Sequence, residues 1–236
     1  MKSDEKKAVL LTGSEGRRAL VKRAGLPWLP MNSNFDEDGA AGKFDRAAIG
    51  SVRRAADYCA YLSAAKNVNA CGYLKNAAVI TADTAVFYKK LLEKPRGENG
   101  VYEMLGGLND NPHEVITAVT IGGLKGKRLP NGLSKFGNEI INYYMNEAMG
   151  VAYVTDVFPE EGENGAFITF TAVSRVLLSG VTRELIKRTI EEENPFACSG
   201  GYTIDGLLKP YFKILSGTEE NIIGLPLSEI LEVLLK

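Results

Sequence analysis

The stretch Ala77-Ala78-Val79-Ile80-Thr81-Ala82-Asp83-Thr84 says most about the fold of this chain of 236 residues. Its apolar residues form a run of strand length, and Asp83 lies near the carboxyl end of that run. A carboxylate placed where a strand opens into a loop can reach a ligand. Asp83 is therefore a candidate for chemistry. The alternative is that Asp83 only caps the turn after the strand, as many Asp residues do.

The amino-terminal part of the chain predicts a second strand and an anion site. Ala8-Val9-Leu10-Leu11 is apolar, and Thr12-Gly13-Ser14-Glu15-Gly16-Arg17-Arg18 follows it as a small-residue turn that opens a helix. Backbone N–H groups at the start of a helix favour anions, and guanidinium groups bind phosphate oxygens in pairs. The segment therefore predicts a phosphate site. A solvated Arg pair is the alternative, because neither P-loop nor dinucleotide-binding spacing is present.

A long helix is predicted from Asp45 to Lys66. The apolar residues that repeat there at steps of three and four are Ala48, Val52, Ala55, Cys59 and Leu62. The next position of this face is Lys66. A lysine on a buried face either meets an anion or extends its ammonium group to water at the end of the helix. Lys94, just before Pro95, is a second cation expected near the same edge.

Strands and helices alternate along the rest of the chain. We expect strands at 115–121, 151–158, 166–176 and 211–215, and helices at 101–108, 133–148, 182–193 and 227–235. This mixture predicts an α/β fold with a mixed, twisted sheet and flanking helices.

The composition excludes several classes of protein. A formal net charge of −1 argues against a broad nucleic-acid surface, so a phosphate site must be a local cluster. The sequence has no signal-peptide pattern and no membrane-spanning run, and three cysteines indicate reduced thiols. We therefore expect a cytoplasmic protein that binds neither a membrane nor a nucleic-acid polymer.

The single histidine limits the chemistry further. Without several histidines the chain cannot form a multi-histidine zinc site or an H-E-x-x-H motif, and a Ser-His-Asp triad would need His113. We expect a structural role for His113, and a buried rather than nucleophilic role for Cys198. Catalysis must then depend on carboxylates, lysines and arginines.

The chain resembles the Maf-like nucleoside triphosphate pyrophosphatases, also called septum formation inhibitor proteins, over nearly its whole length. The resemblance is carried by the order and spacing of short motifs rather than by any one of them. In chain order these are the amino-terminal strand with Arg17-Arg18, Asp36-Glu37, Lys66, Ala82-Asp83-Thr84, Lys94-Pro95 leading into Met104-Leu105, His113-x-Val115-x-Thr117, the stretch Cys198 to Gly206, and Gly224-Leu225-Pro226-Leu227.

The resemblance implies two lobes around a central cleft, as in inosine-triphosphate-pyrophosphatase-like proteins, with residues 1–236 as one domain. It implies hydrolysis of a nucleoside triphosphate between its α and β phosphates, with a divalent metal, Mg²⁺ or Mn²⁺. Asp83, helped by Glu37, would act as general base or as metal ligand. The expected cationic residues are Arg17, Arg18, Lys66 and Lys94, which would hold the triphosphate together with Ser14. Asp205 would read the base.

The chain also departs from the family pattern. The family usually has Ser-x-Ser-Pro-Arg-Arg where this chain has Gly13-Ser14-Glu15-Gly16-Arg17-Arg18, and one branch has Lys and Gln at the positions of Cys198 and Asp205. The surroundings of Cys198 resemble instead the branch associated with 7-methyl-GTP, whereas Ala82-Asp83-Thr84 resembles the first branch, so the base stays open. These departures keep a second hypothesis, a degenerate member that binds a nucleotide or a protein partner without hydrolysis. A third, a glycosyl or acyl hydrolase that uses Asp83 and Glu37, fits poorly with so many cations.

The interval from about 122 to 165 is longer than the family pattern requires. Its predicted helix at 133–148 could cover the cleft, or contact a second copy of the chain through Tyr143, Tyr144 and Met145. Peripheral packing of this insertion is the alternative.

Overall fold

The computed structural model describes residues 8–42, 44–71, 74, 77–123, 144–146, 151–153 and 168–235. Over these residues one mixed sheet has the strand order β2-β1-β3-β5-β8-β7-β6, and β4 and β9 pair with β3 and β8 outside that path. The strands are β1 (Ala8–Leu11), β2 (Leu29–Met31), β3 (Ala78–Tyr88), β4 (Lys90–Leu92), β5 (Asn111–Gly122), β6 (Tyr144–Asn146), β7 (Val151–Tyr153), β8 (Ile168–Leu178) and β9 (Phe212–Ser216). The predicted mixed α/β sheet with flanking helices is confirmed.

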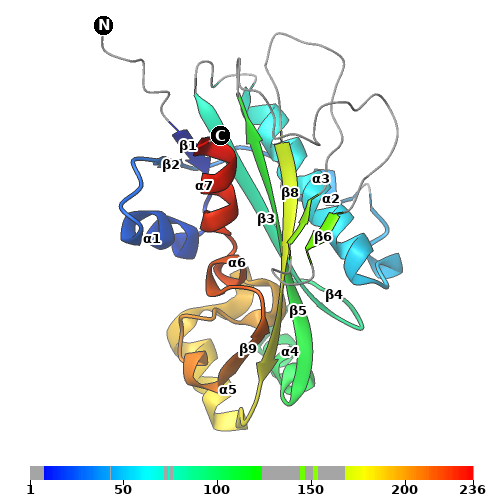
Figure 1. The fold of residues 1–236 in the computed structure, drawn as a ribbon. Coiled ribbons are helices and arrows are strands. Elements are labelled where there is room, and N and C mark those ends of the chain that lie inside the picture. The colour runs from blue at the N-terminus through cyan, green and yellow to red at the C-terminus, as the bar shows by residue number, and fades with distance from the viewer. Residues whose placement is uncertain are drawn as a thin grey trace, which may run out of the picture.

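Helices cover both faces of this sheet. They are α1 (Glu15–Arg23), α2 (Glu37–Ala41), α3 (Val52–Cys71), α4 (Gly97–Leu108), α5 (Arg183–Glu193), α6 (Glu219–Ile223) and α7 (Leu227–Leu235). Figure 1 shows α1 and α7 on one side of the long strands and α3 on the other. It shows α4 and α5 at the lower end of the long strands, away from α7. None of the helices described is both long and apolar enough to cross a bilayer.

Alternation along β3 sends its side chains into different cores. Ile80 and Ala82 pack with α1 and α7, whereas Ala85 and Phe87 pack against α3. The face of α3 is rich in small buried residues such as Ala55 and Cys59, which allow the helix to lie close to the sheet. Asp83 has the same parity as Ala85, so its side chain lies on the α3 side of β3.

The sheet has a gap beside β3. β1 pairs with β3 in parallel, and this pairing ends where Leu11 lies opposite Thr81. β4 pairs with the same strand in antiparallel orientation, and that pairing begins only at Val86. In the part of the chain that the structure describes, residues 82–85 therefore pair with β5 alone. We call this unpaired edge of β3, residues 82–85, the β3 gap. Asp83 lies within it.

Several predicted boundaries change in the structure. Asp83 lies in the middle of an eleven-residue strand rather than near its end, because β3 continues to Tyr88. The long helix begins at Val52, since Asp45 caps a separate short turn, and it continues past Lys66 to Cys71. Tyr144–Asn146 is a strand where a helix was predicted. The rest of the 133–148 segment and most of the 122–165 insertion lie outside the described residues, as does Tyr143 of the predicted dimer contact.

Candidate active site

Lys66 joins the two carboxylates that the sequence singled out. Its ammonium nitrogen lies 2.7 Å from Glu37 Oε1 and 3.9 Å from Asp83 Oδ1. It also donates to the carbonyl oxygen of Ala82, at 3.4 Å. Its side chain is 5 % exposed, compared with 47 % for Glu37 and 15 % for Asp83. Lys66 therefore meets anions in the β3 gap rather than water at the end of its helix.

The two carboxylates have opposite electrostatic environments. Burial raises the pKa of Asp83, and the charges of Lys66 and Arg17 only partly oppose this. Burial also acts to raise the pKa of Glu37, but the charge and hydrogen bond of the Lys66 ammonium, together with the charges of Lys94 and Arg17, outweigh burial and leave that pKa lowered. Glu37 is thus held as the anion, whereas Asp83 is the carboxylate with the greater tendency to take up a proton.

Arg17 reaches the β3 gap from the other face of the sheet. Its Nη1 donates to Ala82 O at 2.9 Å, its Nη2 to Thr84 Oγ1 at 2.8 Å, and its Nε to Gly224 O at 2.7 Å. Burial lowers its pKa, against the opposing charges of Asp83 and Glu37. A single guanidinium group therefore connects α1, β3 and the turn between α6 and α7.

The other residues of the predicted phosphate segment lie at the amino-terminal rim of the gap. Ser14 is the N-cap of α1 and accepts a hydrogen bond from the backbone of Arg17. Arg18 Nη2 donates to Thr12 O and to Asn32 Oδ1, which follow β1 and β2. Glu15 is exposed in the first turn of α1, where a negative charge is favourable to the helix.

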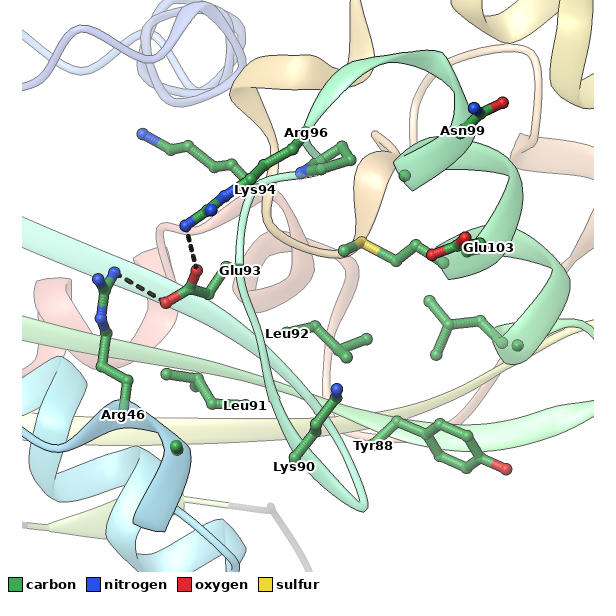
Figure 2. Close-up of a pocket in the computed structure, with 16 residues that line it drawn as sticks. Arg46, Tyr88, Lys90, Leu91, Leu92, Glu93, Lys94, Arg96, Asn99 and Glu103 are labelled. Carbon is green, nitrogen blue, oxygen red and sulfur yellow. Dashed lines mark ion pairs between the residues drawn. The ribbon is translucent and has the colours of Figure 1, made fainter.

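Lys94 lies at the opposite rim, between β4 and α4. The charge of Lys94 helps to lower the pKa of Glu37 and partly opposes the raised pKa of Asp83. Lys94 also lines a cavity of about 740 Å³ between β4, α4 and the turn at Arg46. In Figure 2, Glu93 lies between Arg46 and Arg96, with ion-pair distances of 2.9 and 3.9 Å. Lys94 and the Arg46–Glu93–Arg96 cluster thus line one cavity next to β4.

Asp205 is exposed in the turn after the Cys198–Tyr202 segment. Burial raises the pKa of the partly buried Cys198 thiol, and the charges of Lys94, Asp205 and Glu193 act on it as well. No contact between Asp205 and the carboxylate pair occurs in the described residues, so the proposed role of Asp205 in base reading stays a prediction.

His113 has the structural position expected for it. Its ring is fully buried in β5, with Nε2 2.9 Å from the Tyr202 hydroxyl and Nδ1 3.1 Å from Asn111 O. Burial lowers its pKa, so the imidazole is held neutral. This pair fastens the Cys198–Tyr202 segment to the sheet.

Sequence reasoning missed four residues of the site: Thr84, Thr117, Asn221 and Gly224. Thr84, Thr117 and Gly224 do lie in motifs quoted from the sequence, but no role was assigned to them there, and Asn221 lies in none of those motifs. Thr84 and Thr117 are direct partners in the β3–β5 register. Asn221 and Gly224 come from the far end of the chain, and no local pattern links them to Arg17.

The described residues contain no cluster of three or more His, Cys, Asp or Glu side chains arranged around a metal ion. Mg²⁺ is usually held by one or two carboxylates together with substrate phosphates, and does not need such a cluster. Asp83 and Glu37 are two such carboxylates, and their oxygens already share one cation, Lys66.

Fold and site together define an α/β protein in which the carboxylates Asp83 and Glu37 share a buried lysine beside a gap in the sheet, with Arg17 at the same gap. The family model "Maf-like protein" matches residues 7–236, and the chain belongs to this family.

Its relatives include proteins named dTTP/UTP pyrophosphatase. The one from Thermosipho africanus is 26 % identical over 229 residues, which cover 97 % of this chain and 92 % of the relative. The one from Pelotomaculum thermopropionicum is 24 % identical, with 98 % and 96 % covered. The one from Carboxydothermus hydrogenoformans is 28 % identical over 170 residues, with 72 % and 71 % covered.

Proposed function

We propose that this protein is a nucleoside triphosphate pyrophosphatase, which hydrolyses the bond between the α and β phosphates and releases a nucleoside monophosphate and pyrophosphate. The observation that carries the proposal is the pair Asp83 and Glu37, whose pKa values are pushed in opposite directions around one buried lysine. Paired carboxylates with separated pKa values are typical of sites in which one group moves a proton and the other stays charged.

Asp83 is assigned the role of general base. A carboxylate whose pKa is raised toward the working pH is a better proton acceptor than an ordinary one. It takes a proton from water, the water oxygen forms a bond to the α phosphorus, and the bond from that phosphorus to the bridging oxygen breaks. The electron pair leaves with pyrophosphate, and the proton on Asp83 returns to solvent.

The cations supply the opposing charge. Lys66 is buried between the carboxylates and keeps Glu37 ionised, and Lys94 and Arg18 lie on opposite rims where they would meet phosphate oxygens. Positive groups fixed in place before the reaction stabilise charge that develops on a leaving group. Such an arrangement favours phosphate chemistry over the glycosyl or acyl hydrolase alternative.

A divalent metal fits the same carboxylates. Asp83 and Glu37 would hold Mg²⁺ or Mn²⁺ together with the phosphates, and the ion would neutralise phosphate charge and acidify water when bound.

Pyrimidine nucleotides are the first substrates to test. The relatives carry the names of dTTP/UTP pyrophosphatases, which supports UTP and dTTP over 7-methyl-GTP. Ser14 and Arg18 are proposed to bind the triphosphate, and Asp205 the base. A cytoplasmic location and a homodimer remain expectations that accompany this proposal.

The experiment is pyrophosphate release from UTP, dTTP, 7-methyl-GTP and ordinary purine triphosphates, with Mg²⁺, with Mn²⁺ and with a chelator. Asp83→Asn is compared with wild type, because it keeps the volume of the side chain and removes the base. Loss of a general base lowers kcat by a factor of about 100 to 10,000. Unchanged turnover in Asp83→Asn would refute the assignment.

The degenerate-binder hypothesis gives a different result in the same series. A ligand that binds only the folded protein raises its thermal stability whether or not it is hydrolysed. Stabilisation of wild type by UTP without pyrophosphate release would favour the binder. Reversion of Cys198 to Lys would then test whether that departure abolished the activity.

A further inference from the structure

The hydroxyl groups of Thr84 and Thr117 form a hydrogen-bonded chain that begins at Arg17. Arg17 Nη2 lies 2.8 Å from Thr84 Oγ1, Thr84 Oγ1 lies 2.9 Å from Thr117 Oγ1, and Thr117 Oγ1 lies 2.8 Å from the carbonyl oxygen of Asn221. We call these three bonds the Arg17 relay. It runs from α1 over the neighbouring strands β3 and β5 to α6.

The chemistry of the groups fixes the direction of every bond. A carbonyl oxygen only accepts, so Thr117 donates its single hydroxyl hydrogen to Asn221. Thr84 must then donate its hydrogen to Thr117, which leaves its oxygen as an acceptor for Arg17. Hydrogen bonds in such a chain polarise one another, so the oxygen that faces the guanidinium is a stronger acceptor than an isolated hydroxyl.

Both ends of the relay are fastened. The buried side chain of Asn221 donates to Val115 O at 3.1 Å and to Ser174 Oγ at 2.9 Å, which holds its backbone in place. At the other end, Gly224 accepts from Arg17 Nε. A Cβ atom on Gly224 would come within 2.7 Å of Thr84 Oγ1 and 3.0 Å of Arg17 Nε, so the guanidinium fits only against a glycine.

We infer that Thr84 and Thr117 are positioning residues that aim Arg17 at the phosphates of the substrate. This inference rests on the proposed function. Three of the five N–H groups of Arg17 are used by Gly224, Ala82 and Thr84, and within the described residues the other two remain for a ligand. A planar guanidinium held at three points has one orientation, and that orientation determines whether the remaining N–H groups meet phosphate oxygens.

The matched variants come from one strand. Thr117→Val keeps the shape of the side chain and removes the hydroxyl, and Thr117→Ser restores a hydroxyl. The control is Thr120→Val, because Thr120 is equally buried in β5 and its hydroxyl lies 2.9 Å from that of Thr169, outside the relay. Each Val variant removes a hydrogen bond between two threonine hydroxyls, and Thr117→Val also removes the bond to Asn221 O, so both are expected to lose stability.

The first measurement follows the Arg17 Nε–H signal by NMR in the ligand-free protein. Wild type, Thr117→Ser and Thr120→Val are expected to show this hydrogen protected from exchange with water, and Thr117→Val to show fast exchange. Equal protection in Thr117→Val and Thr120→Val would overturn the relay, and this result does not depend on any enzymatic activity.

The second measurement is kcat/KM for pyrophosphate release from UTP. In Thr117→Val, loss of a hydrogen bond that orients a charged group is expected to lower kcat/KM about tenfold or more. In Thr117→Ser and Thr120→Val, kcat/KM is expected to stay close to the wild-type value. In an Arg17→Lys background the same Thr117→Val change should have no further effect, since the relay acts only through the guanidinium. Equal losses in the two Val variants, or a full further loss in Arg17→Lys, would overturn the positioning role.

The two proposals fail in different ways. If wild type releases no pyrophosphate from any triphosphate, the proposed function is wrong, and the NMR result still decides whether the relay holds Arg17. If wild type is active and Thr117→Val is equally active, the function stands and the positioning role is wrong.

Discussion

Replacing Lys66 by Met should make the stability of this protein depend on pH through Asp83. Met retains most of the apolar stem of Lys66 and removes the ammonium group between Glu37 and Asp83. In wild type the charge of Lys66 is the largest influence that opposes the raised pKa of Asp83. Without it, that pKa rises further.

The size of the effect follows from exposure. Glu37 is 47 % exposed and can return to water, so loss of its ion pair should cost only about 0–1 kcal/mol. Asp83 is 15 % exposed and keeps its place, and a buried charge that loses its partner costs about 3–5 kcal/mol. Because the distance to Asp83 is 3.9 Å and Arg17 remains nearby, we expect a loss somewhat below that range, about 2–3 kcal/mol, at neutral pH.

The sign of the pH dependence follows from linkage. A carboxyl group with a raised pKa binds its proton more tightly in the folded state than in the unfolded state. The destabilisation caused by its charge is therefore absent below the ordinary pKa of Asp and fully present above the raised pKa of the folded state. The loss of unfolding free energy in Lys66→Met should therefore grow as pH rises. Urea unfolding with a chelator at about pH 5 and about pH 8 measures it.

Two further variants make this result decisive. Lys209→Met removes an exposed ion pair with Glu219 at 3.0 Å, and should cost about 0–1 kcal/mol at both pH values. In an Asp83→Asn background, the stability loss caused by Lys66→Met should no longer depend on pH, because residue 83 then carries no charge that needs a partner. A loss in Lys66→Met that is the same at both pH values would refute the reasoning.

Two other predictions concern the frame of the site. Gly224→Ala should lower the free energy of unfolding by about 2 kcal/mol or more, because the residue has a φ of +102° and a Cβ there would contact Thr84 and Arg17. Gly25→Ala, at φ +64° in open space, should lower it by only about 1 kcal/mol. Equal losses for the two variants on urea unfolding would contradict this. His113, the only histidine, has a lowered pKa in the fold, so the unfolded chain takes up its proton first and stability should fall as pH drops below about 6.5. In His113→Gln this part of the pH dependence should disappear, and a variant that follows the wild-type curve would exclude His113 as its source.

The sequence predicted the fold where local patterns decide it. The apolar strand before Asp83 and the helical face with Val52, Ala55, Cys59 and Leu62 both formed as expected, because period and propensity act on neighbouring residues. The place of Asp83 was predicted for an incorrect reason. Its own strand does not end there, but the neighbouring β1 does, and pairing between strands cannot be read from one segment.

Other features of the site depend on contacts that a sequence does not display. Lys66 was expected either to meet an anion or to reach water, and only the packing of α3 against β3 decides between them. Arg17 was recognised as a cation, but its three backbone and hydroxyl partners come from β3 and from the turn after α6. The predicted helix at 133–148 was wrong at Tyr144–Asn146, where pairing with β7 overrides a helical pattern.

The bond from Arg17 to Gly224 spans 207 positions of the chain. During synthesis the first helix leaves the ribosome long before its partner Gly224 exists, so a growing chain has no completed site. Contacts between such distant segments form late, because closing a long loop is entropically costly. A messenger truncated before Gly224 would therefore yield a chain that lacks one of the three contacts holding the Arg17 guanidinium.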